Sequence, residues 1–236
     1  MYRYLLVDLD DTLLDFRRSE RVSLAAAMRR YGLPVTGEAL SAYSRINISW
    51  WQRLERGEIT REEVFPGRFR EFLRVMGSDA DPVAMGEFYE KGLETCAFVL
   101  PGTFAALRTL RREGRRIYAA SNGSVRVQRS RLRLSGVGKL LDGVFISEEI
   151  KREKPEEEFF LEVFSRIPGL KKEECVMIGD SLTSDIAGAA RAGLLSVWIR
   201  RPGTPAPEGI RPDHTVSSFS EVPLLLRRIG EGAKEH

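Results

Sequence analysis

The sequence of 236 residues predicts an α/β fold, in which a doubly wound parallel sheet carries an inserted domain of four helices. Short apolar runs alternate with helical patterns over most of the chain, as in right-handed crossover units. Each apolar run ends in a polar or glycine-containing turn, which is typical of buried parallel strands. One long stretch, about 16–95, breaks this alternation because it contains helical patterns and no strand pattern.

Six apolar runs are the expected strands of the sheet. They cover residues 5–7, 117–120, 144–146, 176–178, 197–199 and 215–216. The helical patterns between or after them cover residues 104–112, 125–134, 156–167, 186–192 and 222–229. A segment rich in proline and glycine, 202–209, is expected to be a surface loop. Since ligands bind beyond the carboxyl ends of the strands in such sheets, we expect the functional site at that edge.

The stretch without strands predicts a separate helical domain. Its helical patterns are amphipathic and are separated by short turns that contain glycine. They cover residues 18–31, 38–56, 61–76 and 82–95. We therefore expect a core domain of residues 1–15 and 97–236 and a helical domain of residues 16–96.

Composition and charge argue against several classes of protein. The net charge of +3 is a small difference between 37 basic and 34 acidic residues that are interspersed along the chain. The densest basic cluster, 126–133, is interpreted as a solvated helix face, so no nucleic-acid partner is expected. Two cysteines, Cys96 and Cys175, are too few for a disulfide framework and are expected to be buried thiols. Without a leader pattern or a membrane-spanning run, the chain is expected in the cytoplasm and away from membranes.

Three aspartates follow the first expected strand: Asp8, Asp10 and Asp11. Asp8 and Asp10 are two residues apart, so their side chains can converge on one point from the strand end and the loop. Clustered carboxylates repel one another and need a cation to remain ionised together. Magnesium, a hard ion that favours oxygen ligands, is the expected cofactor.

Further polar residues follow later strands or loops at the same edge. Asp180 and Asp185 form a second acidic pair, which could supply a metal ligand and its support. The turn 121–123 offers a hydroxyl and backbone N–H groups to phosphate oxygens. Lys154 precedes Pro155, which is expected at the first position of a helix. Each feature alone is more often structural, but together they supply a nucleophile, an acid, a metal site, phosphate donors and a fixed cation.

These motifs resemble those of the haloacid dehalogenase superfamily of hydrolases. The matching residues are 8–12, 121–123, 154–155 and 179–185, which span almost the whole chain. The inserted helices resemble the α-helical cap of the first type in that family, and the core is expected to be Rossmann-like. The true dehalogenases of the family lack the second aspartate of the first motif. Because Asp10 is present here, the resemblance implies phosphoryl transfer.

The resemblance implies roles for the acidic residues and the lysine. Asp8 would attack phosphorus, and Asp10 would act first as general acid and then as general base. Asp8, the backbone carbonyl of Asp10 and Asp180 would hold magnesium. Asp185 would support Lys154 or a metal-bound water more readily than ligate the metal itself, and Lys154 would offset the charge on Asp8 and the phosphoryl group.

The resemblance also implies how substrate is bound. Ser121 and the N–H groups of Asn122 and Leu9 would bind the non-bridging phosphate oxygens. A second resemblance, to the YjjG-type pyrimidine 5′-nucleotidases, implies a pyrimidine nucleoside 5′-monophosphate as substrate. The segments that carry it are Trp51, 57–60, 67–69, 146–149 and 215–218.

Several alternatives remain open at this point. A phosphosugar or phosphoglycolate phosphatase, or a phosphomutase, would share the same core motifs, and a non-catalytic binding protein could keep the fold. Trp51 and Arg68 are candidates to contact the non-phosphate part of the substrate. Alternatively, Trp51 packs among the helices with Trp50 or Leu54, and Arg68 is a surface side chain. The chain is expected to act on a small phosphate monoester as a monomer or a homodimer.

Overall fold

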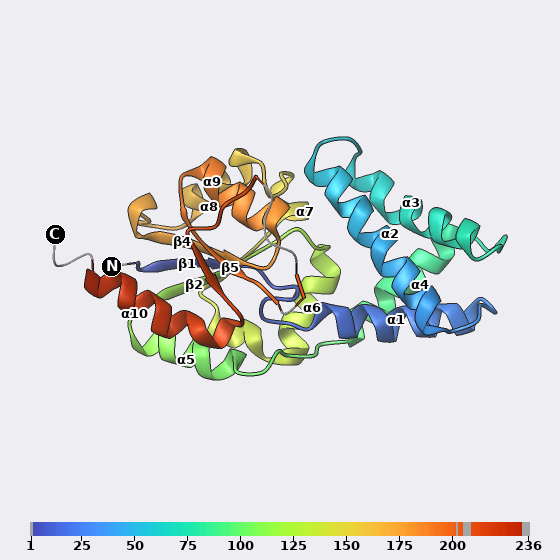
Figure 1. The fold of residues 1–236 in the computed structure, drawn as a ribbon, viewed down its shortest axis with the longest axis horizontal. Coiled ribbons are helices and arrows are strands. Elements are labelled where there is room, and N and C mark those ends of the chain that lie inside the picture. Colours follow the sequence, from blue (N-terminus) through green and yellow to red (C-terminus); the bar gives the residue numbers. More distant parts are fainter. Residues whose placement is uncertain (1, 202, 205–208, 233–236) are drawn as a thin grey trace.

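A six-stranded parallel sheet forms the centre of the computed structural model, which describes residues 2–201, 203–204 and 209–232 (Figure 1). The strand order is β3-β2-β1-β4-β5-β6, and every neighbouring pair is parallel. The strands are β1 (Tyr4–Val7), β2 (Arg116–Ser121), β3 (Gly143–Ile146), β4 (Cys175–Gly179), β5 (Leu195–Ile199) and β6 (His214–Val216). The order reverses between β1 and β4, and this switch point is where such sheets bind ligands.

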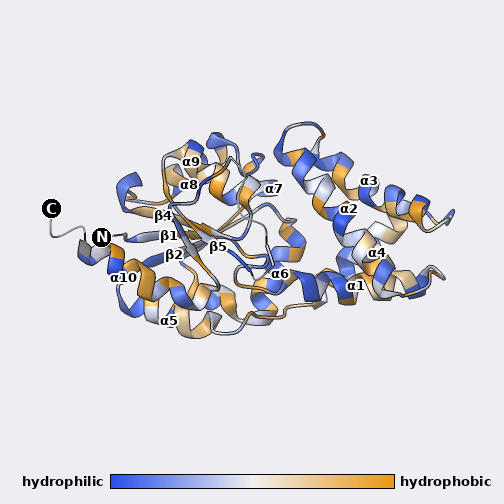
Figure 2. Ribbon diagram, in the orientation of Figure 1, coloured by the Kyte–Doolittle hydropathy of each residue, from blue (hydrophilic) through white to orange (hydrophobic). Residues whose placement is uncertain are grey.

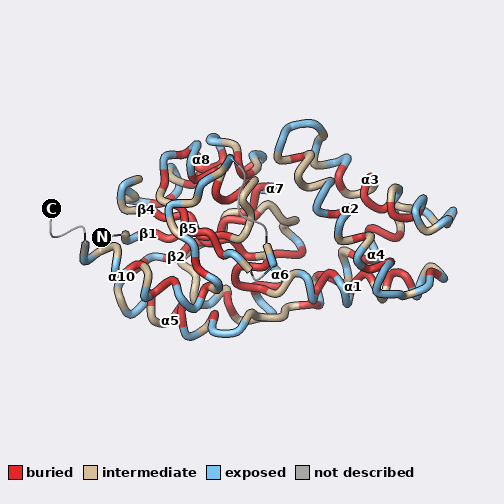
Figure 3. The backbone as a smooth tube through the Cα atoms, viewed as in Figure 1, coloured by how far each residue is buried: buried red, intermediate tan, exposed pale blue. Residues whose placement is uncertain are grey.

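Helices cover both faces of the sheet, so its strands are buried on both sides (Figure 3). Leu5 and Val7 of β1 join the apolar cluster beneath α5 (Thr103–Arg112), α6 (Val125–Ser135) and α10 (Val222–Gly232). Tyr4 and Leu6 join the opposite cluster. That cluster lies beneath α8 (Glu157–Arg166) and α9 (Ala187–Ala192), while α7 (Ser147–Ile150) follows β3. Apolar and polar residues alternate along α5 and α10, because one side of each helix faces the cluster that contains Leu5 and Val7 (Figure 2).

Four helices between β1 and β2 form a separate bundle with its own apolar core (Figure 1). They are α1 (Phe16–Arg30), α2 (Gly37–Glu55), α3 (Arg61–Val75) and α4 (Pro82–Thr95). Local sequence sets where they begin: the side chains of Asp15, Thr36 and Asp81 accept hydrogen bonds from backbone N–H groups of the first turns of α1, α2 and α4. The bundle meets the core along α6, whose Val127 packs into the cluster of the bundle.

The structure confirms the expected fold class and adjusts some element boundaries. Helix α8 begins at Glu157, so Pro155 lies before the helix and not at its first position. The expected helix 186–192 is α9 preceded by a π-turn, Leu182–Ile186. The expected loop 202–209 falls largely outside the described residues. The domain boundaries at residues 15/16 and 96/97 stay predictions.

The expectation of buried thiols is confirmed. Cys96 and Cys175 are buried free thiols. Within the part of the chain that the structure describes, no helix is both long enough and apolar enough to cross a membrane.

Candidate active site

Asp8 stands at the carboxyl end of the central strand, beside the switch point of the sheet. Its backbone N–H continues the ladder with a hydrogen bond to the Ile178 carbonyl (2.9 Å), which fixes the residue at the end of β1. Its carboxylate accepts a hydrogen bond from Lys154 Nζ (2.8 Å). Burial raises the pKa of Asp8 to about 8, although Lys154 opposes this effect. The side chain is thus largely buried, and it needs further positive charge nearby to remain ionised.

Lys154 is fully enclosed, and its three ammonium donors are all used. Nζ donates to Asp8 Oδ1, to Asp185 Oδ1 (2.7 Å) and to the Ala120 carbonyl (2.6 Å). Burial alone would lower its pKa, but the Asp185 and Asp8 carboxylates raise the pKa above its usual value. The Asn122 side chain fixes the backbone of Lys154 by donating to its carbonyl (2.8 Å) and accepting from its N–H (2.9 Å). Asn122 therefore positions the lysine in addition to any contact with phosphate.

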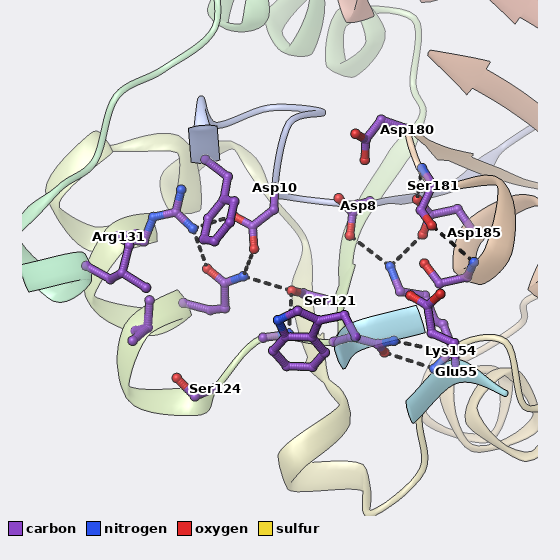
Figure 4. A pocket seen from close by; sticks show the side chains of 18 of the residues that line it. Asp8, Asp10, Glu55, Ser121, Ser124, Arg131, Lys154, Asp180, Ser181 and Asp185 are labelled. Carbon is purple, nitrogen blue, oxygen red and sulfur yellow. Dashed lines mark hydrogen bonds and ion pairs between the residues drawn. The ribbon is translucent and has the colours of Figure 1, made fainter. Parts of the chain in front are cut away.

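Three carboxylates meet beside Lys154, those of Asp8, Asp180 and Asp185 (Figure 4). One oxygen of each lies within 4.8 Å of the others. Burial, followed by repulsion from Asp8, raises the pKa of Asp180 well above its usual value. Gly179 makes room for the group, because a Cβ there would lie 2.1 Å from Asp185 Oδ2. Three carboxylates against one lysine form an all-oxygen donor set with excess negative charge, which fits a hard divalent cation.

The side chain of Asp10 points away from this cluster, toward helix α6 (Figure 4). Its Oδ1 is paired with Arg131, and its Oδ2 accepts a hydrogen bond from Gln128 Nε2 (2.6 Å). Gln128 Nε2 also donates to Ser121 Oγ (2.9 Å), and Gln128 Oε1 accepts from Arg131 Nη1 (3.1 Å). Asp10 and Ser121 are therefore joined through one side chain of α6, that of Gln128.

The expectation that residues 126–133 form a solvated helix face is wrong at Arg131. Arg126 and Arg129 are exposed, as expected, but Arg131 is completely buried. One face of α6 is covered by the bundle and the site, and Arg131 and Gln128 share that face at a spacing of three residues. No pattern in the sequence separates Arg131 from the neighbouring arginines of α6, so sequence reasoning did not identify Gln128 and Arg131.

The two remaining core candidates are Ser121, which lines the cavity, and Leu9, which does not line it. Ser121 is buried at the end of β2, and its hydroxyl accepts from the Gly123 N–H (3.1 Å). Leu9 is fully buried, and its carbonyl accepts from the N–H groups of Leu13 and Leu14. The structure thus brings Asp8, Asp10, Ser121, Asn122, Lys154, Asp180 and Asp185 to the wall of one cavity of about 180 Å³.

The helical bundle supplies the other wall of this cavity. Trp51 lines it and stands edge-on to Phe65, with 6.2 Å between the ring centroids. Arg68 also lines it but is not a surface side chain: it is 2% exposed and donates to Asn47 Oδ1 (2.9 Å) and Glu90 Oε1 (2.8 Å). The expectation of a surface arginine is wrong because α3 turns Arg68 into the bundle.

Arg61, which sequence reasoning did not identify, fastens the bundle to the core. From the first turn of α3 it donates to the carbonyls of Asn122 and Gly123 (both 2.8 Å) and pairs with Glu153 (3.2 Å). Its guanidinium carbon also lies 5.6 Å from the centroid of the Trp51 ring. The wall that carries Trp51 is therefore attached to the loop that carries Ser121.

Comparison with known proteins identifies the family. The model of the haloacid dehalogenase-like hydrolases matches residues 2–193. The chain is 34% identical over 225 residues to the HAD hydrolase YfnB of Bacillus subtilis, with 95% of each chain covered. The magnesium-bound crystal structure of YfnB superposes with a TM-score of 0.90 over 95% of this chain and 98% of the other.

Two further relatives are pyrimidine 5′-nucleotidases. PynA of Streptococcus pneumoniae is 32% identical over 221 residues, covering 94% of this chain and 93% of PynA. YjjG of Escherichia coli is 28% identical over 223 residues, covering 94% of this chain and 97% of YjjG. The family match spans most of the chain and contains the carboxylates and the lysine of the cavity, so this protein belongs to the haloacid dehalogenase-like hydrolase family.

Proposed function

We propose that this protein is a magnesium-dependent phosphatase that hydrolyses a small phosphate monoester through an aspartyl-phosphate on Asp8. The observation that carries the proposal is the position of the Asp8 carboxylate, which lies 2.8 Å from Lys154 and beside the carboxylates of Asp180 and Asp185. A nucleophile, a fixed cation and an all-oxygen metal site thus converge at one cavity.

In the first step, an Asp8 oxygen forms a bond to phosphorus while the bond from phosphorus to the ester oxygen breaks. Asp10 gives its proton to the departing alcohol oxygen. In the second step, Asp10 takes a proton from a water molecule that attacks phosphorus, and this attack releases phosphate and restores Asp8. Between these steps Asp10 is ionised, and Arg131 and Gln128, its partners in the structure, would stabilise the carboxylate.

Asp8, Asp180 and the backbone carbonyl of Asp10 would hold Mg²⁺, which neutralises charge on the phosphoryl group when it is bound. Asp185 is engaged with Lys154 Nζ and, through Oδ2, with the Ser181 N–H (3.1 Å). Both of its oxygens already have donors, which favours the supporting role. Ser121 and the N–H groups of Asn122 and Leu9 bind the phosphate oxygens.

We propose a pyrimidine nucleoside 5′-monophosphate as the substrate. PynA and YjjG, whose names give this activity, match this chain over nearly its whole length. The Trp51 ring in the cavity wall offers a flat surface of the kind that stacks on a base. The cytoplasm as location and a monomer or homodimer as the state in solution stay predictions.

A panel of phosphate monoesters, assayed with magnesium and again with excess chelator, tests the proposal. We expect chelator-sensitive phosphate release, with kcat/KM highest for uridine or thymidine 5′-monophosphate. A preference for a phosphosugar or phosphoglycolate would contradict the nucleotide substrate and leave the phosphatase mechanism in place. Release of phosphate from none of the esters would favour a non-catalytic binding protein.

A further inference from the structure

Glu55, the last residue of helix α2, lies in the wall of the active-site cavity. Helix α2 reaches the core at the turn Leu182–Ile186, which contains Asp185. Glu55 therefore extends from the helical bundle toward the carboxylates and Lys154 of the core (Figure 4). It plays no part in the reaction steps described above.

The polar side chains on the bundle side of the cavity are largely occupied by one another. Arg68 donates to Glu90, and the second oxygen of Glu90 accepts from Ser124 Oγ (3.1 Å). The Oε2 atom of Glu55 is completely buried and has no hydrogen-bond partner among the described residues, as is also true of Arg68 Nε, although the Arg68 guanidinium is held through its other nitrogens. A buried carboxylate oxygen without a donor costs free energy, and a ligand that brings a hydrogen-bond donor to Glu55 Oε2 would recover it.

The surroundings of Glu55 select the kind of donor. Burial raises the pKa of Glu55 to about 7, with the Thr183 hydroxyl opposing, and either protonation state leaves an oxygen that accepts a hydrogen bond. Asp180 and Trp51 line this cavity and also the larger cleft between the bundle and the core, as Glu55 does. Trp51 lies one helical turn before Glu55 on the same face of α2. A ligand bound along this face of α2 can therefore contact the Trp51 ring and the Glu55 carboxylate at the same time.

We propose that Glu55 is a specificity-determining residue that accepts a hydrogen bond from a sugar hydroxyl of the leaving alcohol. The inference rests on the proposed phosphatase function and narrows it: the preferred esters carry a hydroxylated leaving group, whereas aryl and simple alkyl phosphates leave Glu55 without a donor. In a nucleoside 5′-monophosphate the ribose hydroxyls are the donors nearest to the phosphate. Glu55 would therefore recognise the sugar, and the Trp51 ring would contact the base.

The test compares uridine 5′-monophosphate, its 2′,3′-dideoxy analogue and p-nitrophenyl phosphate as substrates. A hydrogen bond to a charged group contributes about 1.5–3 kcal/mol, so the wild-type protein should prefer the ribonucleotide over the dideoxy analogue by about 10- to 150-fold in kcat/KM. In Glu55→Leu this preference should fall to about one, because kcat/KM for the ribonucleotide should fall far more than kcat/KM for p-nitrophenyl phosphate. Glu55→Gln keeps an acceptor oxygen and should recover part of the preference. Glu58→Gln, an exposed position beyond the end of the same helix, is the control and should behave as wild type.

A second readout does not depend on activity. Because the buried oxygen lacks a partner, Glu55→Leu and Glu55→Gln should raise the melting temperature of the ligand-free protein. An unchanged preference in Glu55→Leu, an equal loss on all three substrates, or a lower melting temperature in both variants would overturn the inference. If the wild-type protein hydrolyses all three esters without preference, the inference fails and the phosphatase proposal stands. If it hydrolyses none, the proposed function itself fails.

Discussion

Replacing Arg131 with methionine should separate the positioning of Asp10 from the rest of the chemistry. Arg131 is fully buried and holds Asp10 Oδ1, while Gln128 holds Oδ2. Methionine keeps most of the apolar volume and removes the charge. The carboxylate then keeps one of its two side-chain partners and is no longer held in one orientation.

The expected losses in kcat and in the free energy of unfolding follow from the contacts that Asp10 makes with Arg131 and Gln128. General acid–base help is worth about 10²–10⁴ in rate. Because Gln128 still binds Asp10, we expect a partial loss, about 10- to 100-fold in kcat on a nucleotide, whose leaving oxygen needs a proton. Breaking a buried ion pair costs about 3–5 kcal/mol. The Asp10 side chain is 29% exposed, so water can partly replace the arginine, and a loss of about 1–3 kcal/mol in the free energy of unfolding is expected.

The assay is kcat for Arg131→Met on uridine 5′-monophosphate and on p-nitrophenyl phosphate, with urea unfolding of the same preparation. The activated ester needs little protonation of its leaving group, so it should lose much less. Arg129→Met is the matched control, because Arg129 lies on the same helix but is exposed and pairs with Glu149. Equal losses on both esters would refute the positioning role and indicate general damage to the site.

The other predictions concern Asp8, the proposed nucleophile, and two residues of the helical bundle, Arg68 and Trp51. Asp8→Asn should abolish magnesium-dependent turnover and leave the circular dichroism spectrum unchanged, since it removes the nucleophile and keeps the side-chain volume; more than a trace of activity would contradict the assignment. Arg68→Met should lower the free energy of unfolding by about 3–5 kcal/mol in urea, because Glu90 loses its buried partner, whereas Arg70→Met, exposed on the same helix, should have little effect. Trp51→Ala should lower kcat/KM for uridine and thymidine 5′-monophosphates far more than for p-nitrophenyl phosphate, and a uniform loss would count against stacking on the base.

The parallel sheet and the candidate residues at its strand ends could be predicted, because both depend on short patterns of apolar and polar residues along the sequence. Two central strands of the sheet are followed directly by candidate site residues, since Asp8 follows Val7 of β1 and Asp180 follows Gly179 of β4. Strand ends at one edge of a parallel sheet must meet, so the sequence order alone brings these residues together.

Residues on helices could not be assigned in the same way. Arg131 resembles Arg129 and Arg133 in the sequence, and only the packing of α4 against α6 decides which arginine is buried. Glu55 and Arg61 contact the core from the bundle, so their roles depend on how the bundle lies on the sheet. That placement follows from long-range packing, which periodicity along one helix does not report.

The central claim, that Asp8 carries the phosphoryl group, is tested most directly by trapping the intermediate. In Asp10→Asn the hydrolysis of the aspartyl-phosphate should be slowed, while transfer from an activated ester such as p-nitrophenyl phosphate, which needs little acid help, should continue. After acid quench, borohydride reduces an aspartyl-phosphate to homoserine, which peptide mass spectrometry locates. We expect homoserine at position 8 in the magnesium-treated sample and none in a chelator-treated one. Label at another residue, or none at position 8 during continued turnover, would contradict the account.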